Sequence, residues 1–152
     1  FIEPYPDLLL SLIKSKNDIK NKLISKKLQE VSVKIFKSLK ENDILFIDST
    51  HISKFNSDVN YIFFKILPTL NKGVIIHFHD IFHPFEYPFS WLKQGIFWNE
   101  IYLLRAFLQF NTTFKIIYFN NYLYQNYKKI LLEELPLYEK NPGGSLYIKK
   151  IK

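Results

Sequence analysis

Three histidines and an aspartate interrupt an apolar run in residues 73–83, which read GVIIHFHDIFH. A strand that only packs has no structural need for imidazoles and a carboxylate in this succession. Imidazole titrates near neutral pH and can act as a general base, and a neighbouring carboxylate can orient it. Carboxylates and imidazoles together can also bind a divalent cation. The end of this run is therefore a candidate site for acid–base or metal chemistry.

A second apolar run ends in the same kinds of side chain. Residues 43–49, DILFIDS, form a near-continuous apolar stretch, which is typical of a strand buried on both faces. Asp48 lies at the end of this stretch, and His51 follows three positions later. In open α/β sheets, ligands bind beyond the carboxyl ends of the strands, so this end is also a candidate site.

Residues 56–70 connect the two runs and form the clearest predicted helix. Their apolar side chains recur at i, i+3, i+4, i+7, i+8 and i+11, and Ser57 or Asn56 can cap the first turn. Two parallel strands joined by such a helix in a right-handed unit are expected to be neighbours. The side chains expected at one rim of the sheet are Asp48, His51, His79 and Asp80.

Each of these residues also has an ordinary structural interpretation. A single Asp at a strand end is commonly a turn or capping residue, and a single His is commonly a structural hydrogen-bond donor. Two strand ends together favour a site, with His79 or His51 as base. His77 shares a side of its strand with His79 but lies deeper, so we interpret it as structural. His83 and Glu86, in the loop that follows, are candidates to line a substrate mouth.

The remaining pattern alternates β-rich runs with amphipathic runs and predicts a single α/β domain over residues 1–152. The first strand remnant ends in Glu3, an acidic position that could accept hydrogen bonds from ribose hydroxyls. The other predicted strands are 22–28, 114–120 and 145–151; the other predicted helices are 7–15, 31–40, 98–110 and 124–135; residues 81–97 are a predicted loop rich in proline and aromatic residues.

The composition argues against several classes of protein. Hydrophobic residues make up 47% of the chain, yet no apolar run is long enough to span a bilayer. The net charge is +7, but Arg105 is the only arginine, which disfavours specific recognition of nucleic acid. The absence of cysteine excludes disulfides and thiolate–zinc sites and is compatible with a cytoplasmic protein.

Five segments of the chain together resemble a known family. FIEPYP, DILFIDSTH, SDVNYIF, GVIIHFHDIFHPFEYP and WNEIYLLRAFL are similar, in this order, to the class I S-adenosylmethionine-dependent methyltransferases. The resemblance is closest to the small-molecule branch, in which strand four ends like IDGxH and strand five ends in HD. It covers nearly the whole chain.

The resemblance implies a Rossmann-like sheet with helices on both faces, parallel strands and an antiparallel C-terminal strand. It also implies S-adenosylmethionine as cofactor, with Glu3 at the ribose, Gln29 near the adenine and Asp48 at the end of strand four. Related metal-dependent enzymes imply Mg, Mn or Fe bound by Asp48, His51 and Asp80. The candidate catalytic residues that the resemblance implies are His79, His51 and Asp80.

The chain departs from the family at its first strand and at its glycine-rich cofactor loop. Its glycines are Gly73, Gly95, Gly143 and Gly144, and none belongs to a GxGxG motif. The chain also lacks methionine, even at position 1. We therefore expect a natural protein with several tens of additional N-terminal residues. We expect the 152 residues alone to be inactive and to bind S-adenosylmethionine weakly or not at all.

The predicted activity is O- or N-methylation of a small polar acceptor such as a sugar or a secondary metabolite. The candidate substrate residues are His83, Glu86, Tyr87, Trp91 and Trp98, with Phe85 in the same lid. Two alternatives stay open: a metal-dependent enzyme similar to cephalosporin hydroxylases, and a non-catalytic carbohydrate-binding or interaction module. The expected partners are a small-molecule substrate and a second copy in a homo-oligomer.

Overall fold

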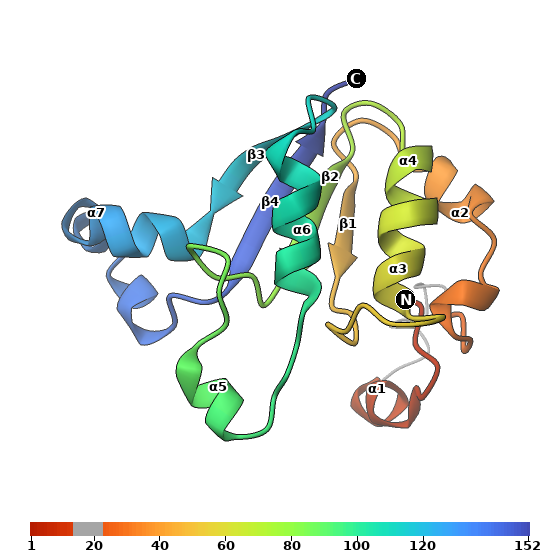
Figure 1. The fold of residues 1–152 in the computed structure, drawn as a ribbon, viewed down its shortest axis with the longest axis horizontal. Coiled ribbons are helices and arrows are strands. Elements are labelled where there is room, and N and C mark those ends of the chain that lie inside the picture. The colour runs from red at the N-terminus through yellow and green to blue at the C-terminus, as the bar shows by residue number, and fades with distance from the viewer. Residues whose placement is uncertain (14–22) are drawn as a thin grey trace.

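The computed structural model describes residues 1–13 and 23–152, and its centre is one sheet (Figure 1). The strands are β1 (Ile44–Ile47), β2 (Ile75–His79), β3 (Phe114–Phe119) and β4 (Ser145–Lys150). They form a four-stranded sheet in the order β1-β2-β4-β3. β1 pairs with β2 in parallel, and β4 pairs antiparallel with both β2 and β3. This mixed Rossmann-like sheet with its antiparallel C-terminal strand confirms the predicted fold class.

The connection between β1 and β2 is the helix predicted for residues 56–70. It consists of α3 (Asp58–Tyr61), the π-helical turn η3 (Ile62–Ile66) and α4 (Leu67–Thr69). Ser57 caps it by accepting a hydrogen bond from the backbone N–H of Asn60, as predicted. The π-helical turn ends two residues before Pro68, which has no N–H to continue an α-helical ladder.

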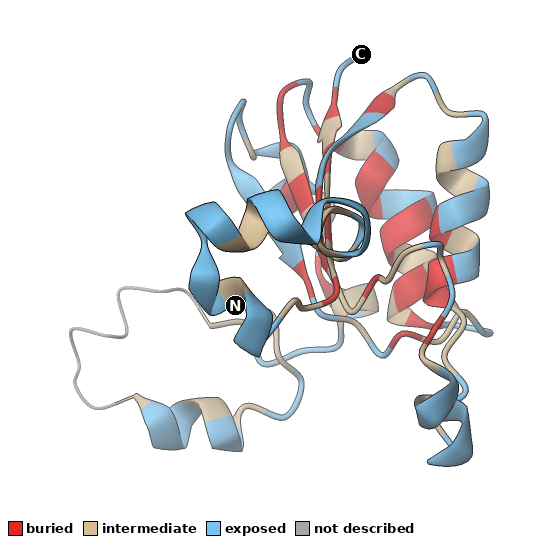
Figure 2. Ribbon diagram, turned by 90° about the vertical axis from the view of Figure 1, so that its left-hand side faces the viewer, coloured by how far each residue is buried: buried red, intermediate tan, exposed pale blue. Residues whose placement is uncertain are grey.

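One face of the sheet carries the hydrophobic core. The apolar stripe of the α3–η3–α4 helix is buried there, together with α6 (Glu100–Gln109). The Phe63 ring lies 5.8 Å from Phe78 of β2 and 5.5 Å from Phe107 of α6, measured between ring centroids. Figure 2 shows buried residues concentrated along the sheet and on the helices packed beside it.

The opposite face of the sheet is only partly covered by the described residues. Phe46, His77 and Tyr147 pack ring against ring there, and Tyr118 hydrogen-bonds through its hydroxyl to Tyr138 in η4 (Pro136–Lys140). The prediction that β1 is buried on both faces is therefore wrong for this structure, since Phe46 is 55% exposed. The reason is that β1 lies at an edge of the four-stranded sheet and no described helix packs over its second face.

The N-terminal part is less regular than its sequence indicates. The predicted strands at 1–3 and 22–28 reduce, among described residues, to one parallel bridge between Ile2 and Ile24. Residue 22, and residues 14–15 of the first predicted helix, lie outside the described residues. The observed helices of this region are α1 (Asp7–Leu12), η2 (Leu28–Glu30) and α2 (Lys34–Lys37).

The loop after β2 and the segment after β3 contain more helix than predicted. α5 (Phe89–Lys93) lies inside the predicted loop, and α7 (Asn120–Glu134) begins four residues before its predicted start. Non-helical backbone angles at Tyr127 kink α7. Within residues 1–13 and 23–152, no helix combines the length and apolar character needed to cross a bilayer.

Candidate functional site

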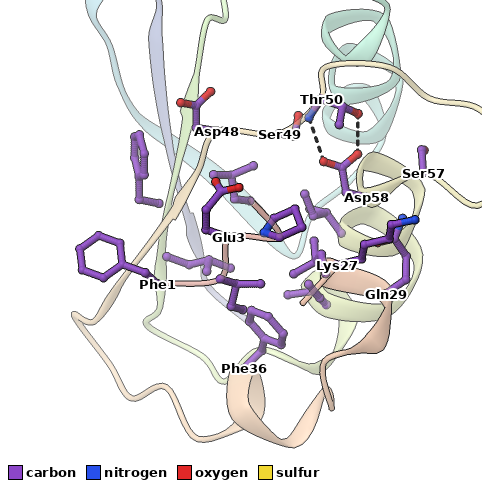
Figure 3. Close-up of a pocket in the computed structure, with 18 of the residues that line it drawn as sticks. Phe1, Glu3, Lys27, Gln29, Phe36, Asp48, Ser49, Thr50, Ser57 and Asp58 are labelled. Carbon is purple, nitrogen blue, oxygen red and sulfur yellow. Dashed lines mark hydrogen bonds between the residues drawn. The ribbon is translucent and has the colours of Figure 1, made fainter. Parts of the chain in front are cut away.

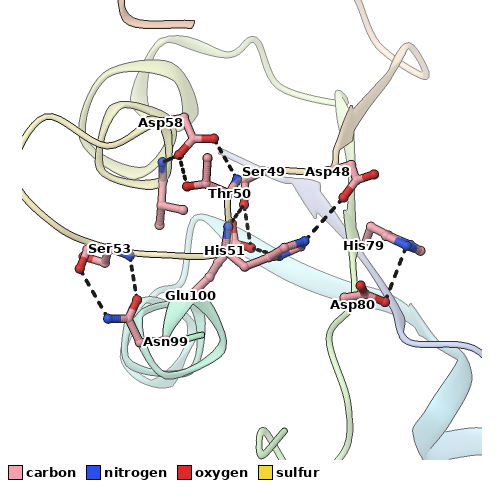
Figure 4. Close-up of polar contacts among 11 residues, drawn as sticks. Asp48, Ser49, Thr50, His51, Ser53, Asp58, His79, Asp80, Asn99 and Glu100 are labelled. Atoms are coloured by element: carbon pink, nitrogen blue, oxygen red, sulfur yellow. Dashed lines mark hydrogen bonds and ion pairs between the residues drawn. The ribbon is translucent and has the colours of Figure 1, made fainter. Parts of the chain in front are cut away.

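The carboxyl ends of β1 and β2 bring the four predicted side chains to one rim of the sheet (Figure 4). Ile47 lies opposite Phe78 in the parallel register, so Asp48 and His79 are the next residues on adjacent strands. His51 and Asp80 follow in the turns beyond the strand ends, both in the left-handed region, with φ of 57° and 55°. Such conformations are unfavourable for non-glycine residues and occur frequently at functional sites.

His51 occupies the most buried position of the rim. It is 3% exposed, and its ring stacks on Trp98 with 4.1 Å between centroids. Its Nδ1 lies 2.8 Å from Oε2 of Glu100, and its Nε2 lies 3.3 Å from Oδ1 of Asp48. Both ring nitrogens of His51 thus face a carboxylate.

The start of α6 holds this arrangement in place. The backbone N–H groups of Asn99 and Glu100 donate to the carbonyl oxygen of His51, over 3.0 and 3.1 Å. The Asn99 side chain accepts from the backbone N–H of Ser53 over 2.6 Å. Ser49 donates its hydroxyl to Oε2 of Glu100 over 2.9 Å. The turn after β1 is therefore tied to the first turn of α6 by backbone and side-chain hydrogen bonds.

These neighbours shift the pKa of His51. Burial lowers the pKa of the imidazole, but the hydrogen bond to Glu100 and the charges of Glu100, Asp80 and Asp48 outweigh it. The net effect raises the pKa of His51 above its ordinary value of 6.5. The protonated, positively charged ring is favoured because the surrounding carboxylates stabilise it.

Glu100 is the member of this cluster that the sequence analysis missed. It is 1% exposed, as deeply buried as the apolar residues Ile101 and Leu104 in the same helix. One signal could have identified it: Glu100 lies four positions before Leu104, on the apolar stripe of the predicted helix. A carboxylate on a buried stripe requires a polar partner, and here the partners are Ser49 and His51.

His79 and Asp80 form a more open pair at the same rim. Nε2 of His79 lies 3.4 Å from Oδ1 of Asp80, and the two side chains are 42% and 21% exposed. His77 lies two residues before His79 in β2. It hydrogen-bonds through Nε2 to the Ser145 hydroxyl and stacks on Tyr147. These contacts are consistent with the structural role predicted for His77.

The described residues do not support the predicted metal site. Residues 1–13 and 23–152 contain no group of three or more His, Asp or Glu side chains arranged to hold a metal ion. The expected set of Asp48, His51 and Asp80 is not assembled around a common point. Its central member, His51, has both nitrogens directed at carboxylates within the protein.

A cavity of about 940 Å³ lies beside the rim, between the N-terminal segment and β1 (Figure 3). Glu3, Gln29 and Asp48, the three residues expected to contact a cofactor, all line it. Asp48 belongs to both the cavity wall and the rim, so the two features are continuous. The apolar part of the wall includes Ile2, Leu28, Phe36, Leu45, Phe46, Ile47, Ile62 and Ile66.

Hydrogen bonds order several polar groups of the cavity wall. Gln29 donates from Nε2 to the carbonyl oxygen of Asn56 over 2.6 Å. Asp58, in the first turn of α3, accepts from both the backbone N–H and the hydroxyl of Thr50. Among the described residues, Glu3 accepts one local side-chain bond, from the backbone N–H of Tyr5.

The cavity fits the main requirements of an adenosyl cofactor. Its volume is within the range of small-molecule sites, and it combines an apolar wall with a few polar groups. The carboxylates of Glu3 and Asp48 can accept hydrogen bonds from hydroxyl and amino groups. No glycine lines the cavity, so the close backbone approach of a glycine-rich loop is not supplied by the described residues.

The predicted substrate residues separate into two groups. Tyr87, Trp91 and Trp98 pack together, with Trp91 and Trp98 at 5.2 Å edge to face, and Trp98 covers His51. Glu86 accepts a hydrogen bond from the Tyr102 hydroxyl. His83 lies away from the three rings and contacts Phe119 and Tyr122. Phe85 also contacts Phe119, so the lid expected from this loop forms only in part.

The comparison with known families agrees with this architecture. Residues 11–81 match a family model described as a methyltransferase domain, and this range contains β1, β2 and the four rim residues. The match, over 71 of the 152 residues, and the mixed α/β sheet support a resemblance to the class I S-adenosylmethionine-dependent methyltransferases. No curated protein matches significantly, and no solved structure does.

Proposed function

We propose that this protein transfers a methyl group from S-adenosylmethionine to an oxygen or nitrogen atom of a small polar acceptor. One observation carries the proposal. The residues expected to hold the cofactor and those expected to meet the acceptor share a single cavity and its rim, joined at Asp48. A shared wall is what a direct transfer between two bound molecules requires, because the reacting atoms must be brought together and aligned.

The cofactor would occupy the cavity. Bound S-adenosylmethionine supplies a methyl group activated by an adjacent sulfonium. Glu3 would accept hydrogen bonds from the ribose hydroxyls, since its carboxylate lines the cavity and its donor among the described residues is a local backbone N–H. Gln29 would lie near the adenine, its amide already held by the carbonyl oxygen of Asn56. The apolar wall would exclude water from the adenosine.

The acceptor would bind at the rim, where His79 would take its proton. In the transfer, the acceptor atom forms a bond to the methyl carbon as the carbon–sulfur bond breaks, and the acceptor loses a proton. His79 is 42% exposed and next to Asp80, which can orient it. His51 is a poorer base because it is buried and both its nitrogens face carboxylates.

The loop after β2 would cover the acceptor. Tyr87, Trp91 and Trp98 form a packed aromatic cluster beside the rim, and a dry cover strengthens hydrogen bonds to the acceptor. Glu86 would contribute from the same loop if its bond to Tyr102 were released. Among the described residues, no group of three ligands supports the alternative of a metal-dependent hydroxylase.

Cofactor binding by the full-length natural protein tests the proposal. S-adenosylhomocysteine, the demethylated product, is the probe for isothermal titration calorimetry. We expect binding to weaken about 10-fold in Glu3→Gln, the loss expected for one charge-assisted hydrogen bond of roughly 1.4 kcal/mol. Glu30→Gln is the matched control, because Glu30 is exposed and does not line the cavity.

Turnover provides the second part of the test. Incubation with radiolabelled S-adenosylmethionine and a panel of small hydroxyl and amino compounds should yield a labelled product. A full-length protein that neither binds the probe nor releases S-adenosylhomocysteine with any acceptor would overturn the proposal.

A further inference from the structure

Glu100 is buried at the end of a chain of polar contacts that leads to the cavity. The chain runs from Glu100 through His51 to Asp48, and exposure increases along it. The Glu100 side chain is 1% exposed, that of His51 is 4%, and that of Asp48 is 54%. A ligand in the cavity can reach Asp48 but not Glu100, so any effect of Glu100 on a ligand must pass through His51.

The geometry also selects which nitrogen of His51 carries a proton. A neutral imidazole has one N–H, and a carboxylate can only accept. The contact of Nδ1 with Glu100, at 2.8 Å, is shorter than that of Nε2 with Asp48, at 3.3 Å. Glu100 is also held by the Ser49 hydroxyl, whereas the Asp48 side chain is half-exposed to water. Nδ1 is therefore the nitrogen that carries the proton in the neutral ring of His51.

We propose that Glu100 is a positioning residue: it holds the His51 ring through Nδ1–H, and the ring directs Nε2 at Asp48 on the cavity wall. This inference rests on the proposed function, in which Asp48 contacts the bound molecules. The charged groups facing His51 are Glu100 from α6, Asp48 from the end of β1 and Asp80 from the end of β2. Trp98 closes the face of the ring. In the protonated ring, Nε2–H can donate to the half-exposed Asp48 carboxylate, and without Glu100 the ring would lose the contact that fixes this donor in place.

Nitrogen NMR of the full-length protein, labelled with ¹⁵N-histidine, tests the inference directly at pH 8. In the wild type, Nδ1 of His51 should show the chemical shift of a protonated nitrogen. In Glu100→Gln the competing acceptor is neutral, and the charged Asp48 becomes the stronger acceptor for the ring. The N–H of His51 should then move to Nε2. Glu134→Gln, a substitution at an exposed position of α7, is the control and should leave the wild-type spectrum unchanged.

Kinetics provide the second readout. Glu100→Gln should lower kcat by about 10- to 100-fold, since small displacements of positioning groups have effects of this size. The KM for S-adenosylmethionine should stay within about 3-fold, because Glu100 does not line the cavity.

Two results would overturn the inference. One is a wild-type His51 with an unprotonated Nδ1, which can be observed even if the variant does not fold. The other is a folded Glu100→Gln protein with the wild-type spectrum and rate. Both differ from failure of the proposed function, which would appear as a wild-type protein without methyl transfer and would leave the spectrum of His51 unaffected.

Discussion

His51, in the turn after β1, and His77, in β2, are two partly or fully buried imidazoles, and their surroundings shift their pKa values in opposite directions. Burial and the nearby His79 lower the pKa of His77, whose polar partner is the neutral Ser145 hydroxyl. His51 is more buried, yet its pKa is raised, because Glu100, Asp80 and Asp48 lie around it. The comparison shows that the charge of the neighbours, more than the depth of burial, decides the protonation of a histidine in this fold.

The same contrast separates a structural from a functional interpretation. His77 stacks on Tyr147 and lies between strands on the half-covered face of the sheet. His51 lies in a turn where the backbone is in the left-handed region and is held by a buried carboxylate. Buried charges are costly, so an arrangement of this kind points to a role beyond packing.

The largest expected effect is on stability. His51→Ala should lower the free energy of unfolding by about 3 kcal/mol or more, because it leaves the buried Glu100 carboxylate without its cationic partner. His77→Ala should cost less, about 1 kcal/mol for its hydrogen bond together with the lost ring packing. Chemical denaturation of both variants measures the difference. Equal losses would contradict the distinction between the two histidines.

The next effect concerns turnover and adds a third histidine to the comparison. His79→Ala in the full-length protein should reduce kcat by about 100-fold or more, the contribution typical of a general base. Its free energy of unfolding should change by less than about 0.5 kcal/mol, since the side chain is 42% exposed. Steady-state assays with the identified acceptor measure the rate. Full activity in this variant would exclude His79 as the base.

A smaller effect is expected in the dependence of stability on pH. The pKa of His51 is raised, so its contribution to the free energy of unfolding is fully present below pH 6.5 and lost as the pH rises through the folded-state pKa. The pKa of His77 is lowered, so its contribution is present above pH 6.5 and lost as the pH falls through the folded-state pKa. NMR titration of the two rings should place His51 above and His77 below 6.5. A reversed order would invalidate the comparison.

The smallest expected effect is a graded change in the pKa of His51 when each of the three surrounding carboxylates is neutralised in turn. Glu100→Gln should lower the pKa of His51 most, Asp80→Asn less, and Asp48→Asn least, following the order of their interactions with the ring. The same NMR titration measures all three variants. Glu134→Gln should not change the pKa, because Glu134 is an exposed residue of α7.

Local patterns account for much of the fold and part of the site. The apolar periodicity of residues 56–70 predicts the connecting helix and its buried face, and Ser57 predicts the cap. Polar residues after two apolar runs predict the rim, because parallel strands end at the same edge. Over the described residues 23–28 the predicted strand is not formed, since a strand requires partners, and in this part of the structure Ile24 makes a single bridge, to Ile2.

The amino-acid sequence by itself determined the approximate positions of β1, β2, β3 and β4, the buried stripe of the connecting helix and the gathering of Asp48, His51, His79 and Asp80 at one rim. These depend on periodicity and on residues close together in the chain. Only the tertiary structure decided that β1 exposes Phe46 and that His51 is held by Glu100, 49 residues away. The physical reason is that exposure and protonation depend on which distant groups pack against a residue, and spacing along the chain does not specify those groups.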